Sequence, residues 1–338
     1  MEVKDSYILL PQPIEEEAVL LLKNAGIKVV IAPDPKPETV APLMKKAKGI
    51  ILRTGIKITN ELISQAENLW TISRTGAGVD NVDVTACSKE GIIVTSSIGA
   101  NSTSVAEHTI SLILALFKQL FLMDKEVRRG NFGIRYKNLP KDLRGKILGV
   151  VGFGKIGSLV AKSCYDIFDM KIIAFDPILP EEIKKRYIEW VKFLSLEELL
   201  KEADVVSIHI PLNKDTKGFI DLEKISLMKP DAFIVNTSRG GVIKEKDLIK
   251  ALQDRIIAGA GLDVFEKEPI DKNNPLLSMD NVILTPHSAA LTKECVVRMA
   301  TEAAKRVIDL FNGYIPEHIV NPEVLSMEKW KFLKNKQS

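Results

Sequence analysis

The stretch GVVGFGKIGSLVAK, residues 149–162, reads as a buried apolar strand, a glycine-rich turn and the first turns of a helix. Its glycines, Gly152, Gly154 and Gly157, have GxGxxG spacing. In this pattern the first glycine permits a tight turn, the second lets a pyrophosphate approach the backbone, and the third lets the helix pack on the strand. The N-terminus of such a helix attracts negative charge. The stretch therefore predicts a dinucleotide-binding strand–turn–helix unit.

This unit lies almost halfway along the chain, because 148 residues precede it. In the first hundred residues, short β-rich runs alternate with amphipathic ones, which favours a parallel sheet covered by helices. The predicted strands are SYILL, KVVIAP, GIILR, WTISRTG and IIVTSS, and the predicted helices are EEEAVLLLKNAG, VAPLMKKAKG, NELISQAEN and VDVTACSKEG. No glycine fingerprint occurs in this part, so its strand ends must serve another purpose.

A second strand–helix series begins with KILGVVGFGKIGSLVAKSC and continues through KIIAFDP, ADVVSIHIP, AFIVNTSRG, IAGAGLDVF and NVILTPH. Six strands are the number expected of a doubly wound dinucleotide domain. After them, TKECVVRMATEAAKRVIDLFNG predicts a long helix that returns the chain to its first domain. We therefore predict an α/β fold in which a Rossmann-type doubly wound parallel sheet, residues 101–288, is inserted into a flavodoxin-like substrate-binding (catalytic) domain, residues 1–100 and 289–338.

Composition excludes several classes of function. The chain has 338 residues, of which 46% are hydrophobic and 27% charged, with a formal net charge of +3 and basic residues spread along its length. This gives no basis for a nucleic-acid or membrane-surface role. Cys87, Cys164 and Cys295 are widely separated, so neither a disulfide framework nor a zinc site is expected, and a reducing compartment fits. The charged start, MEVKDSYILLPQP, does not resemble a signal peptide, so we expect a cytoplasmic protein.

The segment VAEHTISLILALFKQLFLM, residues 105–123, is nearly long enough to span a bilayer. Glu107, His108, Lys118 and Gln119 interrupt it, however. We predict one helix buried within the protein or against a second subunit. Because its apolar surface exceeds what a monomer should leave exposed, we also predict a homodimer formed through this region.

The choice of dinucleotide follows from the strand KIIAFD, which ends at Asp176, 24 residues after Gly152. A carboxylate there can accept hydrogen bonds from the adenine ribose hydroxyls and would repel a 2′-phosphate. The next residues, Pro177 and Ile178, include no arginine to receive that phosphate. The sequence therefore favours NAD over NADP.

Hydride transfer to a keto acid requires carbonyl polarisation, a proton donor and an anchor for the carboxylate. The later strands end in suitable groups: Arg239 in NTSRGG, Asp263 and Glu268 in DVFEKEP, and His287 in TPHSAA. Carboxyl ends of parallel strands meet at one edge of a sheet, so these groups belong beside the nicotinamide.

Over nearly its full length the chain resembles the D-isomer-specific 2-hydroxyacid dehydrogenases, since GFGKIG, NTSRGGVIKEKDLIKAL, GLDVFEKEP and NVILTPH occur in that family's order and spacing. The resemblance implies that His287 donates the proton in reduction and accepts it in oxidation. It also implies that Glu268 hydrogen-bonds the imidazole and favours its protonated form. Arg239 would contact the carbonyl and carboxylate of a 2-keto or 2-hydroxy acid in bidentate fashion.

The same resemblance implies a set of NAD-binding positions and no metal. They are Thr103, Gly152, Gly154, Lys155, Ile156, Gly157, Asp176, His209, Pro211, Thr216, Thr237, Ser238, Asp263, Ser288 and Ala289. One of them has a plain structural alternative, because His209 can simply terminate a strand.

In the first domain, SRTGAGVDNVD follows a strand and offers consecutive backbone N–H groups around Gly76, Ala77 and Gly78. Such a turn can cradle a substrate carboxylate.

Three arginines bear on which acid is bound. Arg53 ends the strand GIILR, and Arg74 directly precedes the glycine turn. Phosphoglycerate dehydrogenases carry arginines that face the substrate phosphate at similar positions. Arg135, in the loop after residues 105–123, would contribute across a subunit interface. The resemblance thus favours 3-phosphoglycerate, oxidised to 3-phosphohydroxypyruvate at the head of serine biosynthesis.

Two departures keep other readings open. The chain has PHSAALT where phosphoglycerate enzymes commonly have PHLGAST, and it stops soon after NPEVL, so no appended serine-sensing domain is expected. The nearest alternative is a hydroxypyruvate or glyoxylate reductase. An NAD-responsive, corepressor-like binding protein is a further alternative from another class. Formate dehydrogenase is disfavoured because it has Gln where this chain has Glu268.

Overall fold

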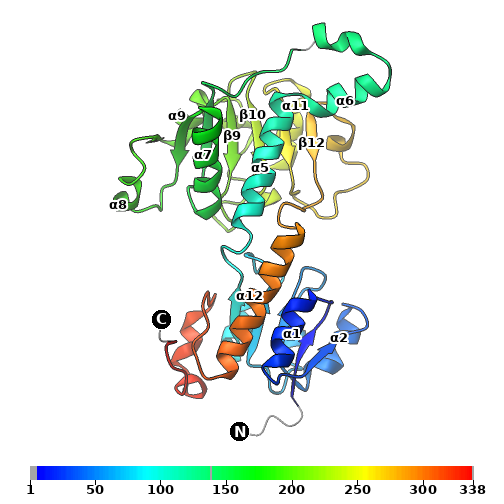
Figure 1. Cartoon of the computed structure of the whole chain (residues 1–338), viewed down its shortest axis with the longest axis vertical. Helices are drawn as coiled ribbons and strands as arrows, with labels where there is room; N and C mark the ends of the chain where they lie inside the picture. Colours follow the sequence, from blue (N-terminus) through cyan, green and yellow to red (C-terminus); the bar gives the residue numbers. More distant parts are fainter. Residues whose placement is uncertain (1–5, 138, 337–338) are drawn as a thin grey trace. The chain divides into compact units, whose positions relative to one another are not determined.

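The computed structural model describes residues 6–137 and 139–336, and it divides the chain into two compact units (Figure 1). The first consists of Met1–Asn101 and Leu291–Ser338, and the second of Ser102–Ala290. Each unit is built on its own parallel sheet, so each is described by itself.

The sheet of the first unit has the strand order β2-β1-β3-β4-β5, with all neighbours parallel. This is the flavodoxin-like order, so the predicted fold class of this part is confirmed. Its strands are β1 (Tyr7–Leu10), β2 (Val29–Ile31), β3 (Ala47–Leu52), β4 (Thr71–Arg74) and β5 (Ile93–Ser96).

The helices of this unit are α1 (Glu16–Asn24), α2 (Pro37–Met44), α3 (Asn60–Ile63), α4 (Val84–Lys89) and α12 (Lys293–Phe311), followed by the 3₁₀ turns η4 (Pro322–Ser326) and η5 (Glu328–Trp330). The long helix α12 lies beside α1, as Figure 1 shows. Ala300, Ala303 and Ala304 let it pack closely on the sheet, where they share a core with Ile8 and Ile51.

Two helix predictions in this unit are wrong in extent. The predicted helix VAPLMKKAKG ends at Met44, and β3 begins at Ala47. Close strand packing explains the difference, because a Cβ on Gly49 would lie 2.7 Å from the side chain of Ile8. The predicted helix NELISQAEN is helical only over Asn60–Ile63.

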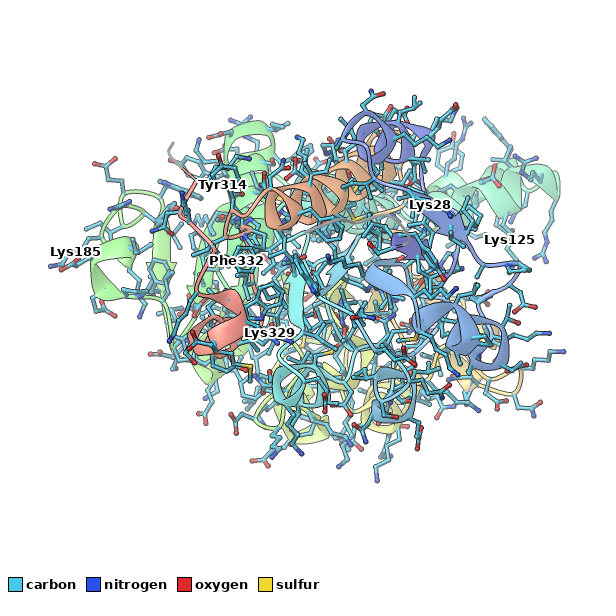
Figure 2. All side chains as sticks on the ribbon, turned by 90° about the horizontal axis from the view of Figure 1, so that it is seen from below. Lys28, Lys125, Lys185, Tyr314, Lys329 and Phe332 are labelled. Atoms are coloured by element: carbon cyan, nitrogen blue, oxygen red, sulfur yellow. The ribbon has the colours of Figure 1, made fainter. Side chains whose placement is uncertain are left out.

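Within the first unit, the segment that follows α12, residues 312–336, packs against the sheet and α12. Trp330 stacks edge-on against Trp70 and donates its indole N–H to the carbonyl of Gly91 at 2.8 Å. Figure 2 shows Tyr314, Lys329 and Phe332 on this segment. The aromatic contacts hold this segment against β5 and α12.

The sheet of the second unit has the order β12-β11-β10-β9-β6-β7-β8, again with all neighbours parallel. The strand order reverses around β6 and β9, which confirms the predicted doubly wound fold. Folds of this type bind their ligands at the carboxyl ends of the strands at this reversal. The strands are β6 (Ile147–Val151), β7 (Lys171–Phe175), β8 (Val191–Phe193), β9 (Val205–Ile208), β10 (Phe233–Asn236), β11 (Gly259–Leu262) and β12 (Val282–Leu284).

The prediction of six strands in this unit is wrong, because β8 adds a seventh at the edge of the sheet. Its sequence, VKF, is three residues long with an exposed lysine in the middle. So short a run carries no clear strand signal.

The helices of the second unit include α5 (Ser102–Phe117), which packs beside α7 (Lys155–Phe168) and on β10 and β11 (Figure 1). The others are α6 (Leu120–Arg128), α8 (Glu181–Lys184), α9 (Leu196–Glu202), α10 (Leu222–Ile225), α11 (Glu245–Gln253) and the 3₁₀ turns η1 (Phe132–Tyr136), η2 (Gly240–Val242) and η3 (Pro275–Ser278).

The single helix predicted over residues 105–123 is broken. It ends at Phe117, Gln119 takes a left-handed φ of 50°, and α6 leaves with a bend of 58°. Among the described residues no single helix has the length and apolar character needed to cross a bilayer, whereas α5 and α6 together meet both criteria as a bent pair.

The apolar surface also lies elsewhere than predicted. Most apolar side chains of α5 are buried within their own unit, whereas α6 and η1 have no buried residue. The exposed apolar side chains of this arm, residues 120–139, are Leu120, Phe121, Val127, Phe132, Tyr136 and Leu139.

Candidate active site

The glycine turn between β6 and α7 has two glycines that the fold itself requires. Gly152 has a φ of 94°, and a Cβ there would lie 2.8 Å from the carbonyl oxygen of His209. A Cβ on Gly157 would lie 2.1 Å from the carbonyl oxygen of Gly152. Gly154 differs, because no protein atom lies within 4 Å of its would-be Cβ. The open space at Gly154, at the N-terminus of α7, suits the close approach of a pyrophosphate.

Asp176 follows β7 and holds this turn. One carboxylate oxygen accepts the N–H of Phe153 at 2.9 Å, and the other accepts the N–H of Leu179 at 3.0 Å. An ionised carboxylate has about four acceptor positions. The N–H of Ile178 also donates to Asp176, at 3.2 Å, so the carboxylate can fix the loop and still accept a hydrogen bond from a ribose hydroxyl.

The imidazole of His287 contacts the carboxylate of Glu268, with 2.6 Å between Nδ1 and Oε2. Burial raises the pKa of Glu268, but hydrogen bonds from His287 and from the N–H of Phe265, with the charges of His287 and Arg239, outweigh it and hold that pKa below its usual value. The carboxylate is therefore the acceptor and Nδ1 carries the proton. This leaves Nε2 of His287 to exchange a proton with a bound molecule.

The backbone at His287 is unusual, since its φ is 51°. A left-handed conformation is uncommon for a residue other than glycine and persists where its surroundings enforce it. Here the N–H of His287 donates to the carbonyl of Asp263 at 2.8 Å. The buried carboxylate of Asp263 accepts the N–H groups of Ser288 and Ala289, each at 2.9 Å. The loop therefore holds the imidazole in place.

Arg239 follows β10, the neighbour of β11 in the sheet. Its Nη1 donates to the carbonyl of Ser238 at 2.7 Å, and its charge acts on Glu268. A Cβ on Gly240 would lie 1.9 Å from the carbonyl carbon of Phe265, so the two loops pack tightly. Arg239, Glu268 and His287 thus come from β10, β11 and β12, three adjacent strands that end at one edge of the sheet.

His209 lies at the end of β9, next to the glycine turn. Its Nε2 lies 2.8 Å from the hydroxyl oxygen of Ser207, and burial lowers the pKa of His209 to about 3. The ring is therefore neutral near physiological pH. It suits contact with an uncharged part of a cofactor better than proton transfer.

The remaining predicted cofactor positions occupy the same unit. Thr103 and Lys155 are exposed in the first turns of α5 and α7, with Ile156 half-buried beside them. Pro211 is exposed in the loop after β9, and its carbonyl accepts the hydroxyl of Thr216 at 2.6 Å.

Two more such positions lie directly before Arg239. The hydroxyl of Ser238 donates to Asn236 at 2.9 Å. Thr237 is buried against Thr109 of α5, with 2.8 Å between the hydroxyl oxygens. The backbone of this turn is therefore held by side chains on either side of it.

In the first unit, the predicted carboxylate cradle follows β4 and is tied to Ser97. The N–H of Ser97 donates to the carbonyl of Gly76 at 3.0 Å, and its hydroxyl donates to the carbonyl of Arg74 at 3.0 Å. Ala77 and Gly78 are half-buried. Ser97 therefore fixes the backbone of the turn, as a site for a small anion requires.

The two arginines predicted to face a phosphate have different environments. Arg74 is buried, and its Nε donates to Asn81 at 2.9 Å. Arg53 is half-buried, and its Nη1 lies 3.0 Å from a carboxylate oxygen of Glu15. Arg53 is therefore the more accessible of the two, and Glu15 is a neighbour that the sequence pattern did not reveal.

Arg135 lies in η1, on the exposed arm of the second unit, over the rings of Phe132 and Tyr136 at 4.6 Å from each centroid. Among residues 6–137 and 139–336, no group of three or more His, Cys, Asp or Glu side chains is arranged to hold a metal.

Three side chains that contact the loops carrying His287 and Arg239 were not predicted from the sequence as part of the site: His108, Thr109 and Thr285. A usable signal was present, because His108 and Thr109 are polar residues within an otherwise apolar stretch.

Residues 110–289 match the family described as D-isomer specific 2-hydroxyacid dehydrogenase, NAD binding domain. The chain belongs to this family. The matched residues are described as the family's NAD binding domain, which identifies NAD as the cofactor.

The relatives of this chain carry two kinds of name. It is 40% identical over 329 residues to D-3-phosphoglycerate dehydrogenase of Methanocaldococcus jannaschii, covering 97% of this chain and 62% of that one. It is 40% identical over 288 residues to glyoxylate reductase of Thermofilum pendens, covering 82% of this chain and 83% of that one. The chain thus spans about three fifths of the length of the phosphoglycerate dehydrogenase.

Among solved structures, the chain is similar to D-lactate dehydrogenase from Aquifex aeolicus complexed with NAD and lactic acid. The TM-score is 0.81 at 33% identity, covering 94% of this chain and 97% of that one. The two-unit architecture of the dehydrogenase family therefore extends over nearly the whole chain.

Proposed function

We propose that this protein is an NAD-dependent D-2-hydroxyacid dehydrogenase that oxidises 3-phosphoglycerate to 3-phosphohydroxypyruvate, at the head of serine biosynthesis. The observation that carries the chemistry is the 2.6 Å contact between His287 and Glu268. It lies at the carboxyl edge of the sheet in the domain that matches the family's NAD binding domain.

In the proposed oxidation, Nε2 of His287 accepts the proton of the substrate hydroxyl. NAD, which the glycine turn and Asp176 would hold, would supply the acceptor for the hydride from the carbon that carries that hydroxyl. Glu268 stabilises the imidazolium that forms, because an ionised carboxylate faces Nδ1. Arg239 binds the carboxylate and the developing carbonyl oxygen, for which a planar guanidinium has the right geometry. In reduction the same groups act in reverse.

The first unit supplies the remaining recognition in this proposal. The turn of Gly76, Ala77 and Gly78 offers backbone N–H groups to the carboxylate. Arg53 is the proposed ligand of the phosphate, because it stands at the carboxyl end of β3 and is half-buried rather than enclosed. The guanidinium of Arg74 lies against this turn, next to Gly76.

A second candidate is a hydroxypyruvate or glyoxylate reductase, and one contact favours it. Glu15 lies 3.0 Å from Arg53, so the charge that a phosphate would require is already partly neutralised. An acid without a phosphate makes no demand on Arg53. The similar identities to phosphoglycerate dehydrogenase and glyoxylate reductase are compatible with either substrate.

The test is a panel of initial rates with NAD or NADH for 3-phosphoglycerate, glycerate, hydroxypyruvate and glyoxylate. If phosphoglycerate is the substrate, Arg53→Gln raises its KM and leaves the KM for glycerate unchanged, whereas Glu15→Gln lowers the phosphoglycerate KM. Lys57→Gln is the control, because Lys57 is an exposed cation close by in the sequence. Preferred turnover of hydroxypyruvate or glyoxylate, with no effect of Arg53→Gln, would establish the second candidate instead.

We also propose a homodimer, now on the arm of residues 120–139 rather than on α5. The arm exposes six large apolar side chains, five of them on α6 and η1, which have no buried residue, and this is more than a monomer normally leaves in water. Phe121→Glu combined with Phe132→Glu should convert a dimer to a monomer in sedimentation velocity. Ile167→Glu, at an exposed apolar position on α7, should not. A monomeric wild type at micromolar concentration would contradict the proposal.

A further inference from the structure

We infer that α5 sets the spacing between the two catalytic loops of the second unit, through two consecutive side chains. His108 holds the loop that carries His287, and Thr109 holds the loop that carries Arg239. Neither is a catalytic residue, since each acts through other side chains. The inference rests on the proposed function for what His287 and Arg239 do, but the contacts behind it stand on their own.

The first connection begins at the imidazole of His108. Its Nε2 lies 3.0 Å from the hydroxyl oxygen of Thr285, and that hydroxyl donates to the carboxylate of Asp263 at 2.6 Å. A hydroxyl has one proton to give. Because Thr285 gives its proton to Asp263, Nε2 of His108 must carry a proton and act as the donor. The same Nε2 lies 3.5 Å from the carboxylate, which adds to the attraction.

The carboxylate of Asp263 passes this restraint to the backbone after His287. It accepts the N–H groups of Ser288 and Ala289, while the carbonyl of Asp263 accepts the N–H of His287. These bonds enclose a residue that has a φ of 51°. His108 thus lies at the inner end of a chain of hydrogen bonds that keeps His287 in a conformation it would not otherwise prefer.

The second connection begins at Thr109. Its hydroxyl donates to the carbonyl of Val105 at 2.7 Å, so it can only accept from Thr237, whose hydroxyl oxygen lies 2.8 Å away. Both threonines are buried. Asn236, the neighbour of Thr237, donates from its side chain to the carbonyl of Arg239 at 3.0 Å. Thr109 therefore fixes the start of the turn that presents the guanidinium.

The helix can serve as a common reference because it lies directly on the strands that lead to both loops. A Cβ on Gly261 of β11 would lie 3.2 Å from Leu112 and 3.3 Å from Leu116, one and two turns after His108. Leu112 and Leu116 are buried in the same core as Val235 of β10. A shift of α5 would therefore displace both loops together, and loss of one side chain should release one loop.

Because the two side chains hold different loops, substitutions at these neighbouring residues should change different kinetic constants. We expect His108→Leu to lower kcat about tenfold with little change in the KM for the acid, because a slightly misplaced His287 transfers the proton less efficiently. We expect Thr109→Val to raise the KM for the acid about tenfold and to lower kcat less, because Arg239 binds the carboxylate. His108→Gln retains a donor near the position of Nε2 and should restore most of kcat.

Two further variants separate positioning from general loss of stability. Ser111→Ala is the control, because Ser111 is exposed on α5 and bonds only within the helix, at the carbonyl of Glu107. Thr285→Val breaks the first connection at the hydroxyl between His108 and Asp263, so it must have the same effect as His108→Leu. It also provides the test if His108→Leu does not fold.

A readout without turnover completes the test. The chain has four histidines, so labelling with ¹⁵N-histidine gives a simple NMR spectrum. In that spectrum the Nδ1 proton of His287, bonded to Glu268, should give a strongly downfield resonance. That resonance should move or broaden in His108→Leu and Thr285→Val, and stay in place in Thr109→Val and Ser111→Ala. Equal changes of kcat and KM in both the His108 and Thr109 variants, or an unmoved resonance in His108→Leu and Thr285→Val, would overturn the inference. A wild type inactive towards all 2-hydroxy acids would refute the proposed function, and the resonance would still decide the positioning role.

Discussion

Replacement of Glu268 by glutamine removes one charge from the proposed proton-transfer pair. Glutamine has the same shape, and its carbonyl oxygen can still accept from Nδ1 of His287, although its NH2 group cannot accept the N–H of Phe265 as Oε1 of Glu268 does. What His287 loses is the attraction between a carboxylate and the imidazolium. Because reduction of a keto acid requires the protonated ring, the variant should lose kcat/KM for reduction at a lower pH than the wild type does.

The size of the shift follows from the contact. Hydrogen bonds to charged groups contribute about 1.5–3 kcal/mol, and exposed ion pairs about 0.2–1 kcal/mol. The side chains of His287 and Glu268 are 44% and 36% exposed, so solvent screens the pair and the value belongs between these ranges. About 1.4 kcal/mol corresponds to roughly one pH unit. The basic limb of the kcat/KM profile for reduction should therefore move about one pH unit down.

The assay is NADH oxidation with a 2-keto acid that the wild type reduces, followed as a function of pH. Glu266→Gln is the matched control, since Glu266 is an exposed carboxylate of the same loop. It should leave the profile in place. If Glu268→Gln left the basic limb where the wild type has it, the carboxylate would not be stabilising the imidazolium, and the reasoning would be wrong.

Three further predictions concern the nucleotide fold and the thiols. Gly154→Ala should leave the melting temperature unchanged but raise the KM for NADH. Gly157→Ala should lower the melting temperature, because only a Cβ at residue 157 meets protein atoms, at 2.1 Å. A reversed pattern in calorimetry and kinetics would contradict this prediction. Asp176→Ser should raise the ratio of kcat/KM for NADP to that for NAD, because the carboxylate that repels a 2′-phosphate is removed, and an unchanged ratio would remove Asp176 from cofactor selection. Burial raises the pKa of Cys87 and of Cys164 to about 12, and Cys295 is buried too. The folded protein should therefore not react with a disulfide reagent near neutral pH. Rapid release of one thiolate equivalent before denaturation would contradict this prediction.

Much of the fold was accessible from the sequence because its signals are local. The glycine turn at residues 152–157 needs small residues for steric reasons that act within a few residues, and apolar runs such as ILGVV identify buried parallel strands. Polar groups at the ends of such runs share one edge of the sheet. For that reason the motifs alone indicated that Arg239, Glu268 and His287 belong together, and the structure brings Glu268 and His287 into contact.

The rest depends on contacts that no local pattern encodes. The break between α5 and α6 occurs at Gln119, a residue with no special preference for a left-handed φ. The pairing of Arg53 with Glu15 joins residues 38 positions apart, and burial of Arg74 depends on Asn81. Charge and position in the sequence suggested that both Arg53 and Arg74 face a phosphate. Only the packing of the fold decides which protein groups each guanidinium already contacts.

In the proposed mechanism, His287 moves the proton while hydride is transferred. Single-turnover kinetics of NADH oxidation by a 2-keto acid, compared between the wild type and His287→Gln, measures this step, with NADH affinity determined by fluorescence on the same samples. We expect unchanged NADH affinity and hydride transfer that is about 10²- to 10⁴-fold slower in His287→Gln. Hydride transfer at the wild-type rate in His287→Gln would contradict it.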